Sequence, residues 1–261
     1  MYPSIITEID SSVGILTLNR PERHNALDEQ LVAEITRALG EFEADPQVRV
    51  IVISASGRSF CAGSDIDWIK RMAGFTPQES QVKAQIFARM FSRLHELSKP
   101  TIARVQGSAL GGGVGLIAAC DVAVATYDAQ FALTEGRLGQ LPALSSPYIL
   151  AAIGERQCRR YLLSGERFSA NEAYRIGLIN EIVPGEEQLD DAIGEIIDSF
   201  LKGSPGALSG CKALIQTISG QPIDDSTIEE TIQRHLQTRH SAEGDEGLAA
   251  FLEKRKPNWA E

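Results

Sequence analysis

The chain has 261 residues, a length that allows one large domain or two small ones with a proper hydrophobic core. Its composition, 43% hydrophobic and 23% charged, has no low-complexity tract and is typical of an ordinary globular protein. The net charge of -10 provides no basic field for a phosphate backbone, so we expect no nucleic-acid partner.

No segment indicates a membrane span or secretion. The most apolar run, residues 109–120, is rich in glycine and shorter than the roughly 20 residues that a spanning helix needs. The N-terminus contains acidic residues and lacks the regions of a signal peptide. The four cysteines are widely separated without CxxC spacing, which favours reduced thiols over disulfides or zinc. We therefore expect a cytoplasmic protein with no membrane partner and no bound metal.

Strand and helix patterns alternate along the first two thirds of the chain. Apolar residues at helical spacing follow Asp28, a plausible N-cap. Thr76-Pro77-Gln78-Glu79 combines a capping box with proline at the first helical position, and predicts a second helix whose apolar face carries Val82, Ile86, Met90 and Leu94. The predicted strands cover residues 13–18, 48–54, 101–106 and 121–126. The order indicates a repeated β-β-α theme in an α/β protein.

Beyond about Val183-Pro184 only helical patterns remain. An apolar stripe begins at Leu189, Ser226-Thr227-Ile228-Glu229 is a second capping-box pattern, and Phe251 to Arg255 suggests a final helix. We predict an α/β core over residues 1–185 and a helical layer over 186–261. An apolar helical layer can serve oligomerisation, although packing within one chain explains the same pattern equally well.

Two glycine-containing segments follow predicted strands. The first is Ser59-Phe60-Cys61-Ala62-Gly63-Ser64-Asp65, and the second runs from Gly107 to Gly115. Glycine lets the backbone turn its amides toward a ligand, and the start of a helix carries free N–H groups. Two converging amides would stabilise an oxyanion. Taken singly, either segment could be a simple tight turn, and neither matches a phosphate loop or a dinucleotide fingerprint.

Together the segments resemble those of the enoyl-CoA hydratase/isomerase (crotonase) family. The similarity rests on Asn19-Arg20-Pro21 with Asn25-Ala26-Leu27, on residues 60–66 and 107–113, and on Phe131 through Leu138, in the family's order and spacing. It extends over essentially the whole chain. The resemblance implies a spiral of β-β-α units with a C-terminal helical layer. It also implies an acyl-CoA substrate and a homotrimer or a dimer of trimers.

The resemblance also implies roles for particular residues. Ser64 and Gly112 match the two oxyanion-hole donors, which act through their backbone N–H groups. A further group of positions matches those that bind the substrate, four of them along the coenzyme A channel: Ala26, Ala62, Asp65 and Ile66, with Gly111 and Gly115 in the second glycine segment. Coenzyme A is part of the substrate, so no separate cofactor is expected.

The acid and base positions depart from the hydratase pattern. Typical hydratases carry one glutamate two residues after the glycine triplet and another twenty residues later; here the first position is Gly115 and the second is Glu135. We predict that Glu135 transfers the proton and that the glycine leaves room for a larger acyl group. The motif of residues 134–148 resembles that of methylglutaconyl-CoA-type hydratases of leucine and terpenoid catabolism, which suggests a branched, acidic acyl chain.

Three functions remain open from the sequence. The first is a lyase that adds water to a 2-enoyl-CoA, or removes it. The second is a Δ3,Δ2-enoyl-CoA isomerase, for which the single Glu135 would suffice. The third is a non-catalytic CoA-binding paralogue, which Gly115 permits and which the presence of Glu135 argues against.

Overall fold

A computed structural model describes residues 2–260 and divides them into two compact units. The first comprises the chain up to Leu97 together with Thr101–Gly194; the second comprises Ser98–Pro100 and the chain from Glu195 onwards. The helix α7 (Glu186–Leu201) begins close to residue 186, where the sequence predicts the helical region to begin, and the division falls inside it.

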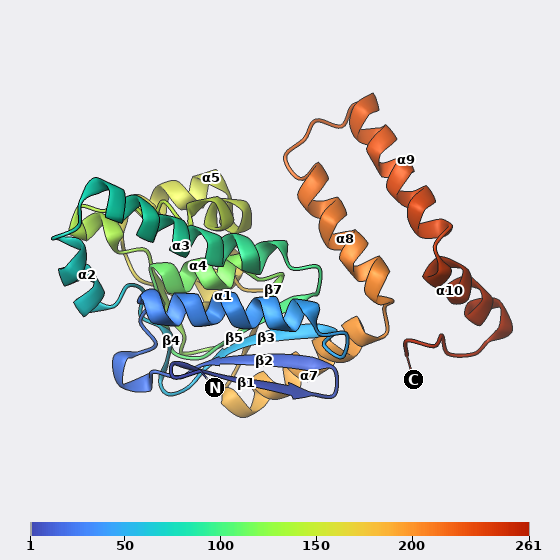
Figure 1. Ribbon diagram of the computed structural model, residues 1–261, viewed down its shortest axis with the longest axis horizontal. Coiled ribbons are helices and arrows are strands. Elements are labelled where there is room, and N and C mark those ends of the chain that lie inside the picture. Colours follow the sequence, from blue (N-terminus) through green and yellow to red (C-terminus); the bar gives the residue numbers. More distant parts are fainter. Residues whose placement is uncertain (1, 261) are drawn as a thin grey trace. The chain divides into compact units, whose positions relative to one another are not determined.

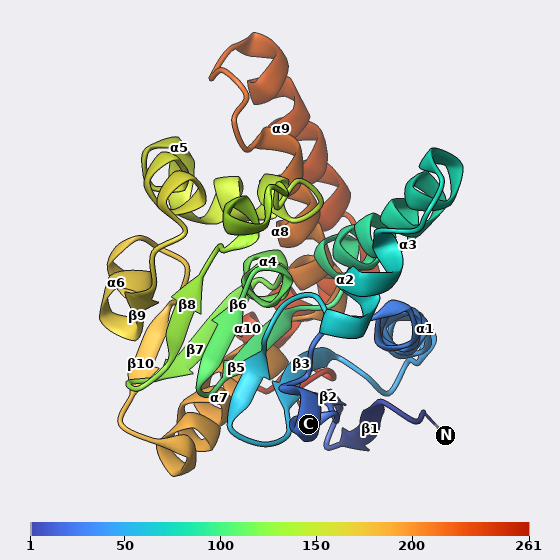
Figure 2. The same cartoon turned by 90° about the vertical axis from the view of Figure 1, so that its left-hand side faces the viewer.

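The first unit is built on a six-stranded sheet (Figures 1 and 2). An antiparallel hairpin forms one edge and the other neighbours are parallel. All six residues of β3 are buried, as expected for a strand covered on both faces. In spatial order the strands are β1 (Ile5–Asp10), β2 (Val13–Leu18), β3 (Val50–Ala55), β5 (Thr101–Val105), β7 (Val122–Thr126) and β10 (Glu181–Val183).

Four short strands form a second sheet, and the chain enters this sheet after each of the strands β3, β5 and β7 of the first. Its order is β4 (Ser59–Cys61), β6 (Ser108–Leu110), β8 (Gln130–Ala132) and β9 (Phe168–Ser169). Thus β3 leads to β4, β5 to β6 and β7 to β8, and a helix follows each pair. The β-β-α repetition predicted from the sequence is confirmed. In each repeat a turn follows the strand of the small sheet. These turns carry the predicted catalytic residues: Ser64 after β4, Gly112 after β6 and Glu135 after β8.

Helices cover one side of the large sheet: α1 (Glu29–Ala44), α3 (Pro77–Glu96) and α4 (Gly112–Ala119) (Figures 1 and 2). Asp28 caps α1, and Thr76 with Glu79 forms the predicted capping box of α3. The predicted apolar face of α3 is partly wrong, because Val82 is 54% exposed. The buried stripe is instead Phe87, Met90, Phe91 and Leu94. The bulky phenylalanines turn the helix so that their rings enter the core.

The remaining elements of the first unit are short helices and one longer one. The turns after β2 and β8 form η1 (Pro21–Arg23) and η2 (Glu135–Leu138). The α-helices are α2 (Ile66–Met72), α5 (Ser146–Ser164) and α6 (Ala170–Arg175). Gly154, at φ 71°, interrupts the helical backbone inside α5.

The second unit contains α8 (Pro205–Ile218), α9 (Asp225–Arg239) and α10 (Ala242–Glu253). Two sequence predictions are wrong in detail. The cap of α9 is Asp224, whose carboxylate accepts from the Thr227 N–H at 3.0 Å, so Ser226 does not form the predicted capping box. The last helix begins at Ala242 and ends at Glu253, because Lys254 adopts the left-handed conformation at φ 56°.

Candidate active site

The backbone on both sides of Ser64 is held by Leu27. The Leu27 N–H donates to the Gly63 carbonyl at 2.7 Å, and the Asp65 N–H donates to the Leu27 carbonyl at 2.9 Å. Ser64 is exposed, and within residues 2–260 its own N–H donates to no protein acceptor. The amide of Ser64 is therefore fixed in position and available to a ligand.

The second amide lies where α4 begins. Gly111 has φ 50° and ψ -117°, a conformation suited to glycine, and its N–H donates to the Ala132 carbonyl at 2.8 Å. Gly112 is the first residue of α4. The first N–H groups of a helix have no acceptor inside it, and in the described part of the chain the Gly112 N–H finds none elsewhere. The positive end of the helix dipole adds to its attraction for an anion.

These two segments are in contact. A Cβ on Gly63 would lie 2.8 Å from the Leu110 carbonyl oxygen and 3.7 Å from the Gly111 Cα. A Cβ on Gly112 would lie 2.9 Å from Cδ1 of Leu27. Leu27 therefore connects both segments: its backbone holds the Ser64 turn and its side chain packs on Gly112. The pair of free amides can serve as an oxyanion hole.

The carboxyl group of Glu135 lies against the same glycine turn. Its Oε1 is 2.5 Å from the point where a Cβ on Gly111 would be, and its Oε2 is buried without a hydrogen-bond partner in the described chain. Burial raises the pKa of Glu135 above its ordinary value, and a hydrogen bond from its own backbone only partly offsets this. A carboxyl group with a raised pKa beside two free amides is suited to proton transfer.

Gly115 does not open the space that the sequence led us to expect. A Cβ at this position would overlap the Cβ of Ser145 and would lie 3.0 Å from Cε1 of Phe91. Gly115, Ser145 and Phe91 are all buried. The volume beside Gly115 is filled by the chain itself, so an acyl substituent has no vacated room there. The direct role of Gly115 in substrate binding stays a prediction.

We expect Gly115→Ala to destabilise the protein. An alanine normally stabilises a helix by about 0.5–1 kcal/mol relative to glycine, but overpacking a core costs about 1–3 kcal/mol and should dominate here. Gly194→Ala in α7 is the matched control, because nothing lies within 4 Å of its added Cβ. In urea denaturation, the free energy of unfolding should fall in Gly115→Ala and rise in Gly194→Ala. Adding Ser145→Gly should recover most of the loss in Gly115→Ala; equal stability of all variants would contradict the contact.

Asp65 anchors the turn that follows Ser64. Its carboxylate accepts from the N–H groups of Asp67 at 2.8 Å and Trp68 at 3.2 Å, which caps α2, and it pairs with Arg23 at 3.2 Å and Arg20 at 3.4 Å. Burial acts to raise the pKa of Asp65, but the Trp68 amide and Arg23 outweigh it and lower the pKa. The carboxylate is thus ionised at neutral pH and engaged in holding the turn.

The other predicted substrate-binding residues surround this turn. The Ala26 carbonyl accepts from Nη1 of Arg20 at 3.2 Å, and the Ala62 N–H donates to the His24 carbonyl at 2.9 Å. Ile66 begins α2 and is 70% exposed. The structure therefore brings Ala26, Ala62, Asp65 and Ile66 together around one turn, as the resemblance implies. Their contacts with coenzyme A stay a prediction.

Among the residues that the structure describes, neither the nearby cysteine nor a group of metal ligands provides an alternative catalytic group. Burial raises the pKa of the Cys61 thiol to about 12, so it remains protonated and a poor nucleophile. Within residues 2–260, no group of three or more His, Cys, Asp or Glu side chains is arranged so that it could hold a metal ion. In the same residues, no helix is long and apolar enough to cross a membrane.

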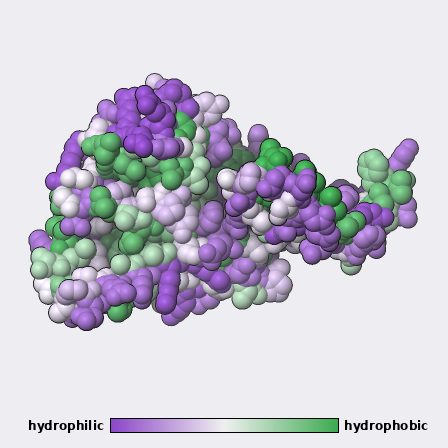
Figure 3. Space-filling view, turned by 90° about the horizontal axis from the view of Figure 1, so that it is seen from above, coloured by the Kyte–Doolittle hydropathy of each residue, from purple (hydrophilic) through white to green (hydrophobic). Residues whose placement is uncertain are grey.

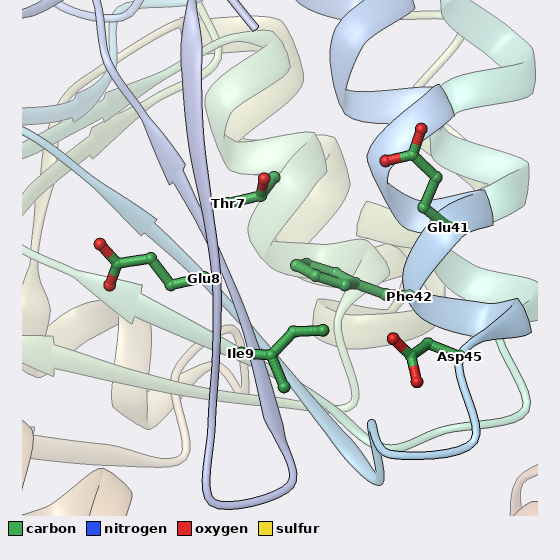
Figure 4. Close-up of a pocket in the computed structure, with 6 residues that line it drawn as sticks. All are labelled: Thr7, Glu8, Ile9, Glu41, Phe42 and Asp45. Atoms are coloured by element: carbon green, nitrogen blue, oxygen red, sulfur yellow. The ribbon is translucent and has the colours of Figure 1, made fainter. Parts of the chain in front are cut away.

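A separate hollow of about 230 Å³ lies between β1 and α1 (Figure 4). In the close-up, Ile9 and Phe42 lie near Glu41 and Asp45, while the side chain of the lining residue Glu8 points to the other side of β1. No lysine or arginine is among its lining residues, so it is poorly suited to a coenzyme A phosphate.

Sequence reasoning missed Leu27, Phe91 and Ser145. Leu27 lies in the Asn25-Ala26-Leu27 motif, but its pairing with Ser64 joins segments far apart in the sequence. Phe91 belongs to the helix whose face was mispredicted. Ser145 has only one local signal, its position before a Ser-Pro pair that begins α5. The contact of its side chain with Gly115 depends on the tertiary fold.

The two sheets, the repeated turns and the helical layer together form the crotonase fold. A solved structure of an enoyl-CoA hydratase from Shewanella pealeana is 37% identical, covers 99% of this chain and 96% of its own, and has a TM-score of 0.96. A Legionella pneumophila protein described as an enoyl-CoA hydratase/isomerase (crotonase) is 39% identical, with 98% of each chain covered and a TM-score of 0.92.

The sequence profile of the enoyl-CoA hydratase/isomerase family matches residues 8–261, and the chain belongs to this family. The crotonyl-CoA hydratase of Syntrophomonas wolfei is 32% identical over 99% of this chain and 98% of its own length.

Proposed function

We propose that this protein is a lyase that adds water to the double bond of a 2-enoyl-CoA thioester, and catalyses the reverse dehydration. The observation that carries the proposal is the buried, unpartnered Oε2 of Glu135 on the glycine turn that presents the Gly112 amide. The name of the crotonyl-CoA hydratase relative supports the same reaction. Family membership makes an acyl-CoA the natural substrate.

The geometry suggests how the reaction proceeds. The thioester oxygen accepts hydrogen bonds from the Ser64 and Gly112 N–H groups, which draws electrons from the double bond toward that oxygen. Water adds to C3, and its proton passes to the Glu135 carboxylate. The same carboxyl then delivers a proton to C2 as the thioester re-forms. The sum is one water added, with no oxidant and no separate cofactor.

The surroundings suit an acyl chain. Exposed apolar residues follow both catalytic segments: Ile66 in α2 is 70% exposed, while Leu138 and Leu141 after Glu135 are 62% and 81% exposed. On the face of the molecule shown in Figure 3, hydrophobic (green) side chains are interspersed with hydrophilic (purple) ones, so exposed apolar side chains are not confined to these segments. The proposal that the acyl group is branched and acidic is supported only by the motif of residues 134–148, because the space beside Gly115 is filled.

A panel of thioesters tests the reaction. We expect 2-enoyl-CoAs to lose their conjugated absorbance and, in ¹⁸O-labelled water, to gain one labelled hydroxyl group. Straight, 3-methyl and carboxylated substrates should be compared, because their relative kcat/KM values decide the acyl preference. A single carboxyl also supports the alternative of a Δ3,Δ2-enoyl-CoA isomerase. Conversion of a 3-enoyl-CoA without label uptake from any 2-enoyl-CoA would replace the hydratase proposal with that alternative.

We also propose a homotrimer or a dimer of trimers, with the second unit contributing to assembly. Ile228, Ile232 and Leu236 recur at four-residue spacing along α9 and are 46%, 45% and 43% exposed. Such a stripe on one helix face is suited to a partner surface. Light scattering coupled to gel filtration measures the mass, and a monomer at micromolar concentration would contradict the proposal.

A further inference from the structure

Two polar side chains pack against the beginning of α4, one at its N-cap and one in its first turn. Gly111 and Gly115 are four residues apart, and the Gly115 N–H donates to the Gly111 carbonyl at 3.2 Å, so the two positions are neighbours one turn apart. The Glu135 carboxyl group lies against Gly111, and the Cβ of Ser145 lies against Gly115. Glu135 and Ser145 therefore both contact the first turn of α4, at positions joined by one backbone hydrogen bond.

The hydroxyl group of Ser145 is buried but little used. The residue is 3% exposed and directly precedes α5, a position where a serine usually caps the helix. Its side chain makes no such cap and instead donates to the Pro142 carbonyl at 3.3 Å, a long hydrogen bond. A hydroxyl oxygen also accepts hydrogen bonds, and in the described chain no donor reaches this one.

Two oxygen atoms with unused acceptor capacity thus belong to residues that contact the first turn of α4: Oγ of Ser145 and the buried Oε2 of Glu135. Buried polar atoms without partners are unfavourable, and sites that contain them commonly take up a ligand or water. A water molecule has two hydrogens to donate, one to each oxygen. Because Gly115 has no side chain and Ser145 fills its place, Ser145 is the group on this turn that can share the water with Glu135.

We propose that Ser145 is a positioning residue that, together with Glu135, holds the water that adds to the substrate. This inference rests on the proposed hydratase function. One hydrogen of the water donates to Ser145 Oγ and the other to the Glu135 carboxylate. The water oxygen forms the bond to C3, the electron pair of the double bond moves toward C2 and the thioester, and the proton passes to Glu135.

Ser145→Ala separates this role from that of Glu135. Alanine retains the Cβ that packs on Gly115 and removes only the hydroxyl. We expect kcat for crotonyl-CoA hydration to fall about 10- to 100-fold, because the reacting water is no longer oriented. Exchange of the C2 protons of butyryl-CoA with D₂O needs the amides and Glu135 but no attacking water, and it should stay within about twofold of wild type. Glu135→Gln should lower both activities by roughly 10²- to 10⁴-fold.

Ser146→Ala is the matched control, because this neighbouring hydroxyl already donates to the Ala143 carbonyl at 2.9 Å. It should leave both rates unchanged. Unchanged hydration in Ser145→Ala, or equal losses of hydration and exchange, overturns the water-positioning role. If Ser145→Ala unfolds, Ser145→Cys keeps the volume with a weaker hydrogen-bonding group and must show the same split for the proposal to stand. A wild-type protein that exchanges protons but adds no water overturns the hydratase proposal itself.

Discussion

Glu135→Gln is expected to lower hydration of the best 2-enoyl-CoA by roughly 10²- to 10⁴-fold, the usual contribution of one positioned acid or base. Glutamine keeps the size of the side chain but cannot exchange a proton with water or with C2. Calorimetric binding of a saturated acyl-CoA should be little changed, because the two backbone amides remain. Steady-state kinetics on the thioester panel measure the effect. Turnover close to wild type would mean that another group handles the proton.

Glu135→Gln should also raise the melting temperature of the protein at neutral pH. The folded protein raises the pKa of Glu135, so the stabilisation associated with its protonated form is present at low pH and is lost as the pH rises through the raised pKa. At pH 7 the neutral glutamine avoids burying a charge, and Glu135→Gln should melt at a higher temperature than wild type. The difference should disappear below about pH 4, under the ordinary pKa of glutamate. A lower melting temperature at pH 7 would contradict the burial argument.

Leu27→Ala is expected to damage both stability and turnover. Truncating a fully buried leucine costs about 2–5 kcal/mol of unfolding free energy. Because the Leu27 side chain supports Gly112, we also expect kcat to fall roughly 10- to 100-fold, since a displacement of about 1 Å at a catalytic group can have such an effect. Urea denaturation and kcat at a temperature where the variant is fully folded measure the two effects separately.

Leu39→Ala provides the control for general loosening. Leu39 is also fully buried and lies on α1, but it is not among the nearest neighbours of a Cβ added at Gly63, Gly111 or Gly112. It should lose similar stability while kcat remains within about twofold of wild type. Leu27→Met, which keeps most of the volume, should restore turnover. Equal losses of kcat in Leu27→Ala and Leu39→Ala would show that Leu27 has no special role in spacing the amides.

Features encoded by local sequence could be predicted well. Asp28 and the Thr76–Glu79 capping box predicted the beginnings of α1 and α3 because a cap depends on residues within one turn. The three-residue strands β4, β6 and β8 were not predicted singly, since they are too short for a periodic pattern. The face of α3 was misjudged because several overlapping stripes along it fit a four-residue spacing, and tertiary packing selects among them.

The candidate site was predictable only as a set of positions. The resemblance indicated Ser64, Gly112 and Glu135, and the structure places their three turns in contact. What could not be foreseen was the content of the space between them. A glycine in a sequence is compatible with an open pocket or with a close neighbour, and only the fold shows that Ser145 occupies the place beside Gly115.

That contact has a consequence for the evolution of the family. Positions 115 and 145 share one small volume, although one lies in α4 and the other directly before α5, 30 residues later in the sequence. A relative that acquires a side chain at the first position must shrink the residue at the second or move the loop that carries it. Side-chain sizes at the two positions should therefore vary inversely among relatives. A relative that gains an acidic side chain at position 115 should also carry a smaller residue at position 145 or a displaced loop before α5. Acquiring or losing a second carboxyl in this site is then a two-residue event, which slows the interchange between one-carboxyl and two-carboxyl enzymes.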